Sequence, residues 1–282
     1  LPRFSLPGGR GVVFWQHAPG HLVERWPQES IALAQRGSEV LEATHGRAPE
    51  FTYAVGLSNG GFQVRRAIEE SDCFDGALTW NAVMWSVRNN PLDSLVEAVR
   101  AWQCGEPERI VAAGFPPDVR SATGTSTLYG KNFATYWYVT LWLHAMHLDP
   151  ETSLAYGDVR EPGPAEAWCA RLGSWDSERS PEIARRIERF QNTGRIRCKL
   201  IDLASEYDHL IPPKIHLEPY RELVEAAGCA AQYRHRTIPN AQHVDAWSED
   251  PGYPMMRAGQ PSVMEAWNEL VAWVEGDGVK SP

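Results

Sequence analysis

The chain has 282 residues, of which 43% are hydrophobic, and it carries a formal net charge of −9 with a pI near 5.5. That length supports one large globular domain with room for an insertion. The acidic balance, with no run of lysine or arginine, argues against a nucleic-acid surface, and the lack of about 18 consecutive apolar residues argues against membrane insertion.

The start of the chain and its cysteines bear on its location. The first residue is Leu1 and no basic-then-apolar leader follows, so we expect a processed or trimmed N-terminus and a soluble protein. Secretion or a periplasmic location after removal of a leader, and a cytoplasmic location, both stay open. Five cysteines lie far apart without a CxxC pair, so no metal cluster is expected and at least one thiol stays outside any intramolecular disulfide.

The first third of the chain predicts alternating strands and helices. The apolar run at residues 11–16 is typical of a buried strand, and residues 27–44 of a helix. Residues 51–56 predict a second strand that breaks directly into another helix, and residues 74–80 a third strand. This alternation indicates an α/β fold with a mostly parallel sheet flanked by helices.

The middle of the chain changes character. Residues 89–191 contain proline- and glycine-rich breaks and helical segments at 92–103 and 134–148. We therefore predict a mainly helical cap, or lid, inserted into an α/β core that comprises residues 1–88 and 192–282.

Strand and helix alternate again after the insertion. Residues 199–204 and 232–238 predict strands, and residues 217–227 and 263–274 predict helices. The loops that follow the two strands lie at the carboxyl end of a parallel sheet, where functional residues of such folds gather.

The break between the second strand and its helix reads Gly56-Leu57-Ser58-Asn59-Gly60, which fits GxSxG. In this motif a tight strand-to-helix turn holds a nucleophilic serine at the top of the sheet. Because a serine hydroxyl is a weak nucleophile near neutral pH, Ser58 needs a histidine base and a carboxylate that orients the histidine.

The order serine, acid, histidine selects the partners. Asp208 lies in the loop after the strand at 199–204, and His243 lies in the loop after the last strand. Asp202 and Glu206 are rivals for the acid, although Asp202 falls within the strand and Glu206 begins the loop.

Two backbone N–H groups are needed to bind the oxyanion. One is expected from Asn59, directly after the nucleophile, and the other from the turn at residues 17–20, where Pro19 has no N–H and the donor is therefore Ala18 or Gly20.

Aromatic residues near the motif and in the insertion helix are candidates for substrate binding. We expect contacts from the first turn, the strand end after the motif and the insertion helix, namely His17, Trp80, Trp85, Trp137 and Trp142. The alternative is that the aromatic helix forms the cap's own core.

With these residues placed, the sequence resembles the α/β-hydrolase superfamily over nearly its whole length, and within it the group of tannase, feruloyl esterase-like enzymes and 3-hydroxybutyrate oligomer hydrolases. The resemblance lies in residues 45–53, 56–61 and 74–76, and in the segments 192–194 and 208–212. Tannase-type enzymes are expected to have disulfide-bonded cysteines beside the serine and the histidine. Here Leu57 precedes the serine, and Gln242 and Val244 flank the histidine.

The predicted function is a serine carboxylic ester hydrolase that uses Ser58, Asp208 and His243. Its substrate would be a small or oligomeric ester with a hydrophobic, hydroxyacyl (3-hydroxyalkanoate oligomer) or aromatic part. Alternatives are an amidase, a lactonase or an acyltransferase with the same triad, or a non-catalytic binding module with this fold. No metal or organic cofactor is implied, the expected partner is the substrate alone, and the oligomeric state stays open.

Overall fold

The computed structural model describes residues 4–6, 10–12, 23–137, 140–141, 144, 148 and 181–276. Within these ranges the main sheet has four strands, each parallel to its neighbour, in the order β3-β4-β5-β6. The strands are β3 (Tyr53–Leu57), β4 (Gly76–Trp80), β5 (Lys199–Ser205) and β6 (Tyr233–Ile238).

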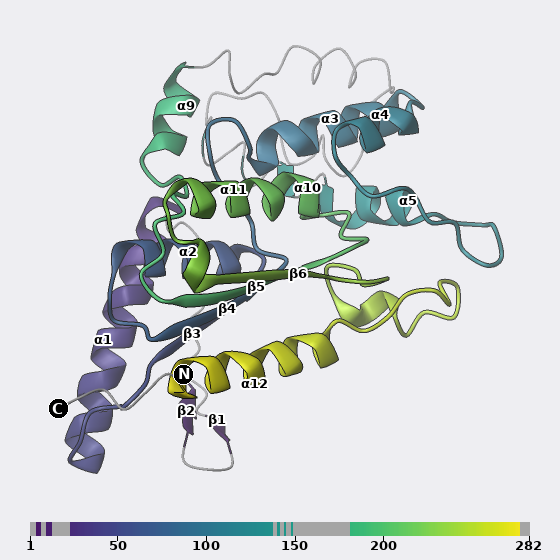
Figure 1. Cartoon of the computed structure of the whole chain (residues 1–282). Helices are drawn as coiled ribbons and strands as arrows, with labels where there is room; N and C mark the ends of the chain where they lie inside the picture. The colour runs from purple at the N-terminus through teal and green to yellow at the C-terminus, as the bar shows by residue number, and fades with distance from the viewer. Residues whose placement is uncertain are drawn as a thin grey trace.

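Helices cover both faces of this sheet (Figure 1). Helix α12 (Gln260–Gly276) packs on one face, whereas α2 (Asn59–Glu70), α10 (Pro213–His216) and α11 (Glu218–Ala226) lie over the other. Helix α1 (Trp26–His45) packs beside α2. The predicted fold class, a parallel sheet flanked by helices, is confirmed.

The strand residues explain why both faces are covered. Ala77 and Leu200 point into a hydrophobic cluster with α2 and α11, while their neighbours Leu78 and Ile201 point into another cluster with α12. Successive strand residues alternate between faces, so the apolar runs predicted for β4 and β5 bury side chains on both sides. Each fully buried leucine or isoleucine stabilises the fold by about 1.5–3 kcal/mol.

The described part of residues 89–191 is helical. It contains α3 (Pro91–Gln103), α4 (Pro107–Ala112), α5 (Leu128–Asn132), the π-helical turn η2 (Phe133–Trp137) and α9 (Pro181–Glu188). In Figure 1, α3, α4 and α9 lie farther from the sheet than α10 and α11, and α5 lies beside α10. One hydrophobic cluster joins Phe62 of α2 to Leu95 of α3 and Ile187 of α9. The division into core and cap therefore stays a prediction.

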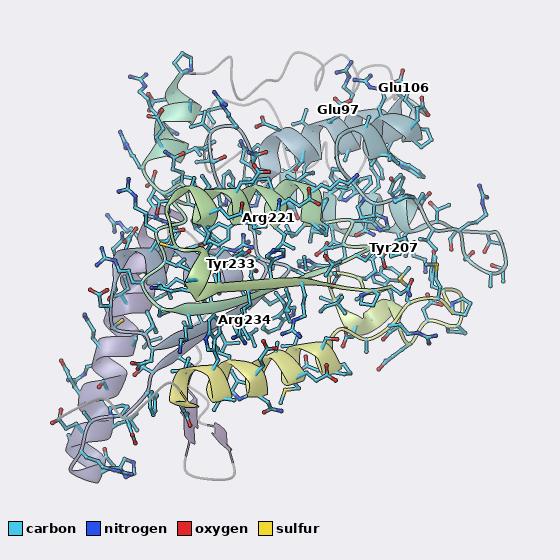
Figure 2. All side chains as sticks on the ribbon, viewed as in Figure 1. Glu97, Glu106, Tyr207, Arg221, Tyr233 and Arg234 are labelled. Carbon is cyan, nitrogen blue, oxygen red and sulfur yellow. The ribbon has the colours of Figure 1, made fainter. Side chains whose placement is uncertain are left out.

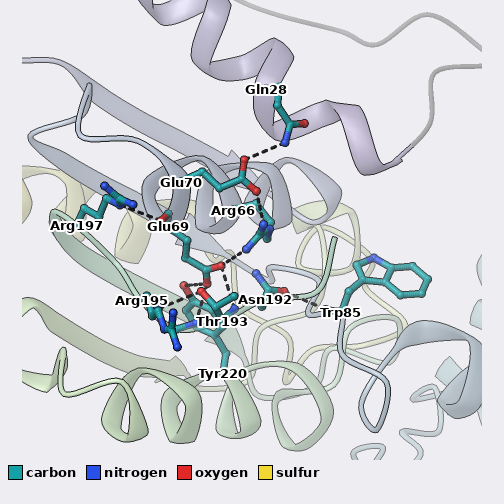
Figure 3. Close-up of polar contacts among 11 residues, drawn as sticks. Gln28, Arg66, Glu69, Glu70, Trp85, Asn192, Thr193, Arg195, Arg197 and Tyr220 are labelled. Carbon is teal, nitrogen blue, oxygen red and sulfur yellow. Dashed lines mark hydrogen bonds and ion pairs between the residues drawn. The ribbon is translucent and has the colours of Figure 1, made fainter. Parts of the chain in front are cut away.

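A buried glutamate fixes the return from this region to the sheet (Figure 3). Glu69 of α2 accepts hydrogen bonds from the backbone N–H groups of Thr193 (3.0 Å) and Gly194 (2.9 Å) and from the Tyr220 hydroxyl (3.1 Å). It also forms an ion pair of 2.6 Å with Arg66. Gly194 has a φ of +70°, and a Cβ there would lie 2.3 Å from a backbone carbon of α11, so the segment before β5 requires glycine at this point.

The predicted N-terminal strand is present at residues 11–12, but its expected place in a parallel sheet is wrong. The strands β1 (Phe4–Leu6) and β2 (Arg10–Val12) pair antiparallel in a separate two-stranded sheet instead of joining the main sheet. Only three residues separate the two strands, and so short a connection permits antiparallel pairing alone, because parallel strands need a crossover of a dozen or more residues. The rest of the predicted strand, residues 13–16, lies outside the described residues.

The cysteines agree with the prediction of at least one unpaired thiol. Cys104 is disulfide-bonded, whereas Cys73, Cys198 and Cys229 are free. Burial, with smaller contributions from Asp75 and Cys73, raises the pKa of Cys198 to about 12, so this thiol stays protonated and unreactive near neutral pH. None of the helices in the described ranges has the length and apolar character needed to cross a bilayer.

Candidate active site

Ser58 occupies a strained turn between β3 and α2. Its backbone has φ 57° and ψ −123°, which side-chain-bearing residues seldom adopt. Its N–H donates to the Trp80 carbonyl at 3.2 Å, and its carbonyl accepts from the N–H groups of Phe62 and Val83, both at 3.1 Å. These bonds hold the serine where a parallel strand turns sharply into a helix, which is the geometry of a nucleophile elbow.

Two glycines permit this turn, and only one of them, Gly56, belongs to the motif. A Cβ on Gly56 would lie 2.3 Å from the Gly60 carbonyl oxygen, and a Cβ on Gly61 would lie 2.4 Å from the Ala82 Cβ. A Cβ on Gly60 would meet nothing within 4 Å. The close approach of helix to strand therefore depends on Gly56 and on the glycine that follows the motif.

Asp208 lies fully buried in the loop after β5. One carboxylate oxygen accepts from the N–H groups of Leu210 (2.8 Å) and Ile211 (2.7 Å), and the other accepts from His243 Nδ1 at 2.7 Å. Burial by itself raises the pKa of Asp208. The charge and hydrogen bond of His243 and the two backbone N–H groups outweigh burial and hold this pKa below its ordinary value, so Asp208 is ionised at neutral pH.

His243 follows β6 and has a side chain that is 11% exposed, against 0% for Asp208. Because Nδ1 donates its proton to a carboxylate, the neutral ring carries its lone pair on Nε2. Nε2 has no hydrogen-bond partner within the described ranges. His243 thus has the tautomer that a general base requires.

Asn81 joins the ends of the strands that carry these residues, and sequence reasoning missed it. Its N–H donates to the Leu203 carbonyl at 2.8 Å, and its Oδ1 accepts from Ser205 N–H at 2.7 Å. Its Nδ2 donates to the His243 carbonyl at 3.0 Å. A φ of 49° allows Asn81 to make these contacts, and asparagine tolerates that conformation better than most residues.

All three predicted residues therefore lie at the carboxyl end of the sheet, the end marked by Tyr207 in Figure 2, whereas Tyr233 marks the start of β6. Ser58 and His243 share no hydrogen bond in the part of the chain that the structure describes. Two neighbouring residues link them indirectly. The Trp80 carbonyl accepts from the Ser58 N–H, and the next residue, Asn81, donates to the His243 carbonyl.

The two rival carboxylates are engaged elsewhere. Asp202 is fully buried within β5, where it forms an ion pair of 2.6 Å with Arg65 and accepts from Thr79 and Tyr233. Glu206 is exposed and accepts from Asn240 N–H at 2.8 Å. Of the three candidates, Asp208 is the one that binds an imidazole.

The predicted oxyanion donors are placed in part. Asn59 is the first residue of α2, so its N–H has no intrahelical acceptor, and no hydrogen bond to another described residue occupies it. Ala18, and with it the turn at residues 17–20, lies outside the described residues.

The residues predicted to bind substrate differ in how deeply they are buried. Trp80 is half-buried in the cluster beneath α12. Trp85 and Trp137 are fully buried, Trp85 against Phe190 and Trp137 with its Nε1 donating to the His209 carbonyl at 2.6 Å. His17 and Trp142 lie outside the described residues. In the ranges that the structure describes, no three His, Cys, Asp or Glu residues are grouped to bind a metal ion.

The sequence matches no protein-family model and no curated protein. Solved structures similar to it include the Pyrococcus horikoshii acylaminoacyl peptidase, at 15% identity and a TM-score of 0.46 over 92% of this chain and 30% of that chain. A puromycin-hydrolyzing peptidase of Mycobacterium tuberculosis aligns at 14% identity and a TM-score of 0.45, over 92% of this chain and 27% of that one. A thermophilic esterase of Thermogutta terrifontis aligns at 16% identity and a TM-score of 0.39, over 92% of this chain and 75% of that one.

This chain thus spans less than a third of the length of the two peptidases. At such identities and TM-scores the similarity carries no argument about activity. A case for function has to rest on the residues of this chain.

Proposed function

We propose that the protein is a serine hydrolase that cleaves carboxylic esters through an acyl-enzyme intermediate. The observation that supports this most is the buried Asp208–His243 hydrogen bond of 2.7 Å at the same sheet end as the strained Ser58. A strained serine, an imidazole of the right tautomer and an orienting carboxylate are the parts that nucleophilic acyl transfer needs.

In the proposed reaction, Ser58 Oγ attacks the ester carbonyl carbon and passes its proton to His243 Nε2. The resulting imidazolium is stabilised by ionised Asp208. The tetrahedral intermediate collapses when the C–O bond to the alcohol breaks and His243 returns the proton to the leaving oxygen. Water then attacks the acyl-enzyme by the same route, releasing the acid and regenerating the serine.

The oxyanion of each tetrahedral intermediate needs preorganised N–H donors. Asn59 N–H, at the amino end of α2, supplies one in this proposal. The second comes from Ala18, as the sequence predicts, and residues 89–191 act as the cap over the site.

The substrate class follows from the sequence resemblance to tannase-like and 3-hydroxybutyrate oligomer hydrolases. We expect an ester whose acyl part is hydrophobic, hydroxylated or aromatic. Amides, lactones and alcohol acceptors can react at the same three residues, so an amidase, lactonase or acyltransferase is the second candidate.

The test is hydrolysis of p-nitrophenyl acetate and butyrate, a 3-hydroxybutyrate trimer, methyl ferulate and matched anilides by the wild-type protein and by Ser58→Ala. We expect ester turnover by the wild type and a loss of at least about 10⁴-fold in Ser58→Ala. A fluorophosphonate probe should label the wild type and not the variant.

Other outcomes separate the alternatives. Faster anilide than ester turnover would favour the amidase, and product diverted to an added alcohol would favour the acyltransferase. If the wild type and Ser58→Ala are both folded, turn over none of the substrates and are not labelled by the probe, a binding module would be favoured.

A further inference from the structure

A second bridge lies beside the Asp208–His243 hydrogen bond. The residue after the acid, His209, and the residue before the histidine, Gln242, are joined by a hydrogen bond of 2.6 Å between Nδ1 and Nε2. Two adjacent side-chain bridges therefore connect the loop after β5 to the loop after β6.

The carbonyl of Pro117 determines the direction of this bridge. It lies 3.1 Å from His209 Nε2 and can only accept, so Nε2 carries the proton. Burial lowers the pKa of His209, against the opposing effects of the Pro117 carbonyl and of Asp208 and Asp118, and the ring is neutral near pH 7. His209 Nδ1 therefore accepts the amide proton of Gln242.

Both members of the bridge are buried, and His209 is also held by contacts on its far side. His209 is 0% exposed and Gln242 is 3% exposed. The His209 carbonyl accepts from Trp137 Nε1 at 2.6 Å, and its ring meets the Tyr129 ring edge-on at 5.2 Å between centroids. These contacts fix the His209 ring, so the hydrogen bond from the buried Gln242 amide sets the separation of the two loops.

We infer that His209 and Gln242 are positioning residues that set the geometry of Asp208 and His243. This inference rests on the proposed function. Neither side chain bonds to Ser58, and both act through the neighbouring backbone. Loss of the bridge should let the imidazole move relative to the serine, and a displacement of about 1 Å in such a site can cost about 10²-fold in rate.

The experiment uses Gln242→Met, which keeps the length and removes the amide, and His209→Phe, which keeps a ring against Tyr129 and removes both nitrogens. We expect each to lower kcat for an activated ester about 10- to 100-fold with little change in KM. Because both break one bridge, the double variant should lose no more than the stronger single variant. His209→Asn retains an acceptor near the Nδ1 position and should recover most of the loss.

The control is Asn192→Leu, which removes another amide that is 3% exposed and bonds the Trp85 N–H at 3.0 Å, away from the two loops. It should lower the unfolding temperature and leave kcat unchanged. Each rate is divided by the fraction of molecules that a fluorophosphonate probe has labelled when labelling is complete. This normalisation removes the contribution of misfolded protein to the protein concentration.

The outcomes separate this inference from the proposed function. Wild-type kcat in Gln242→Met, additive losses in the double variant, or an equal kcat loss in Asn192→Leu would overturn the positioning role. If instead Ser58→Ala is as active as the wild type, the proposed function itself fails.

Discussion

Asp208 and Glu69 are two buried carboxylates that accept hydrogen bonds from nearly the same kinds of donor. Each accepts two backbone N–H groups and one side chain able to carry a positive charge. For Asp208 that side chain is the imidazole of His243, which is 11% exposed. For Glu69 it is the guanidinium of Arg66, and the Tyr220 hydroxyl completes the set (Figure 3).

The difference between the two clusters lies in what the partner can do with a proton. A guanidinium does not give up its proton at accessible pH values, so Arg66 cannot exchange a proton and its contact with Glu69 can only hold chain segments together. An imidazole gains and loses a proton near neutral pH. A buried carboxylate bound to an imidazole can therefore support proton transfer, whereas one bound to a guanidinium can support only the structure.

The largest expected effect is on the reaction. Asp208→Asn keeps the size of the side chain but presents an amide that favours the wrong tautomer of His243, so kcat should fall by about 10⁴-fold. The free energy of unfolding, measured by urea titration, should change far less than the activity. An Asp208→Asn protein with more than a tenth of wild-type kcat would contradict the role assigned to this carboxylate.

Glu69→Gln should produce the opposite pattern. The buried guanidinium of Arg66 loses the one of its two carboxylate partners that is itself buried, and breaking a buried pair in this way costs about 3 kcal/mol or more in unfolding free energy. The activity of the molecules that remain folded should be preserved.

The matched control is Glu70→Gln, because Glu70 also bonds Arg66 but has a side chain that is 27% exposed. Its cost should stay within about 1 kcal/mol. Equal losses of stability in the two variants would show that burial does not distinguish them.

Acid should weaken the packing around His216. Burial, and next Arg65, lower the pKa of His216 from 6.5 to about 3, and this ring accepts the Met84 N–H at 3.1 Å. Since the unfolded chain binds the proton more readily, this contribution to stability is complete above pH 6.5 and is lost as the pH falls toward 3. Between these two pH values the free energy of unfolding should fall by about 1.4 kcal/mol per pH unit for one such histidine.

Urea unfolding at pH 7, 6 and 5 measures this slope. His216→Asn keeps an acceptor for the Met84 N–H and lacks the titration, so its slope should be shallower than that of the wild type. Parallel slopes in the two proteins would rule out His216 as a source of the acid sensitivity.

The smallest effect is expected from Tyr220→Phe. Glu69 loses one of several donors, while the ring stays 4.1 Å from the Arg65 guanidinium that it faces. The unfolding free energy should fall by about 1 kcal/mol. A loss as large as that of Glu69→Gln would mean that the hydroxyl, rather than the ion pair, holds the cluster together.

Local pattern was enough to predict the elements that carry the site. The strand, the glycines and the helix around Ser58 are contiguous, and the loops of Asp208 and His243 each directly follow a strand. Such features depend on a few adjacent residues, so one sequence contains them.

The supporting contacts could not be predicted in this way. Asn81 bonds a residue 162 positions away, and Glu69 bonds a residue 125 positions away. His209 could be recognised as a neighbour of the acid loop, but its bond to Gln242 depends on how two strands lie in the sheet. The aromatic residues show the same limit, since composition cannot tell that Trp85 and Trp137 face inward.

The hydrogen bond between Asp208 and His243 spans 35 residues, and α11 and β6 lie between its two ends. During synthesis on the ribosome the elbow emerges long before this segment does. A nascent chain with a folded elbow would hold a serine without its base, and in the proposed chemistry it could not yet form an acyl-enzyme. Reactivity would begin only when β6 joins the sheet. The rate at which activity returns during refolding would therefore report the rate at which β6 pairs with β5.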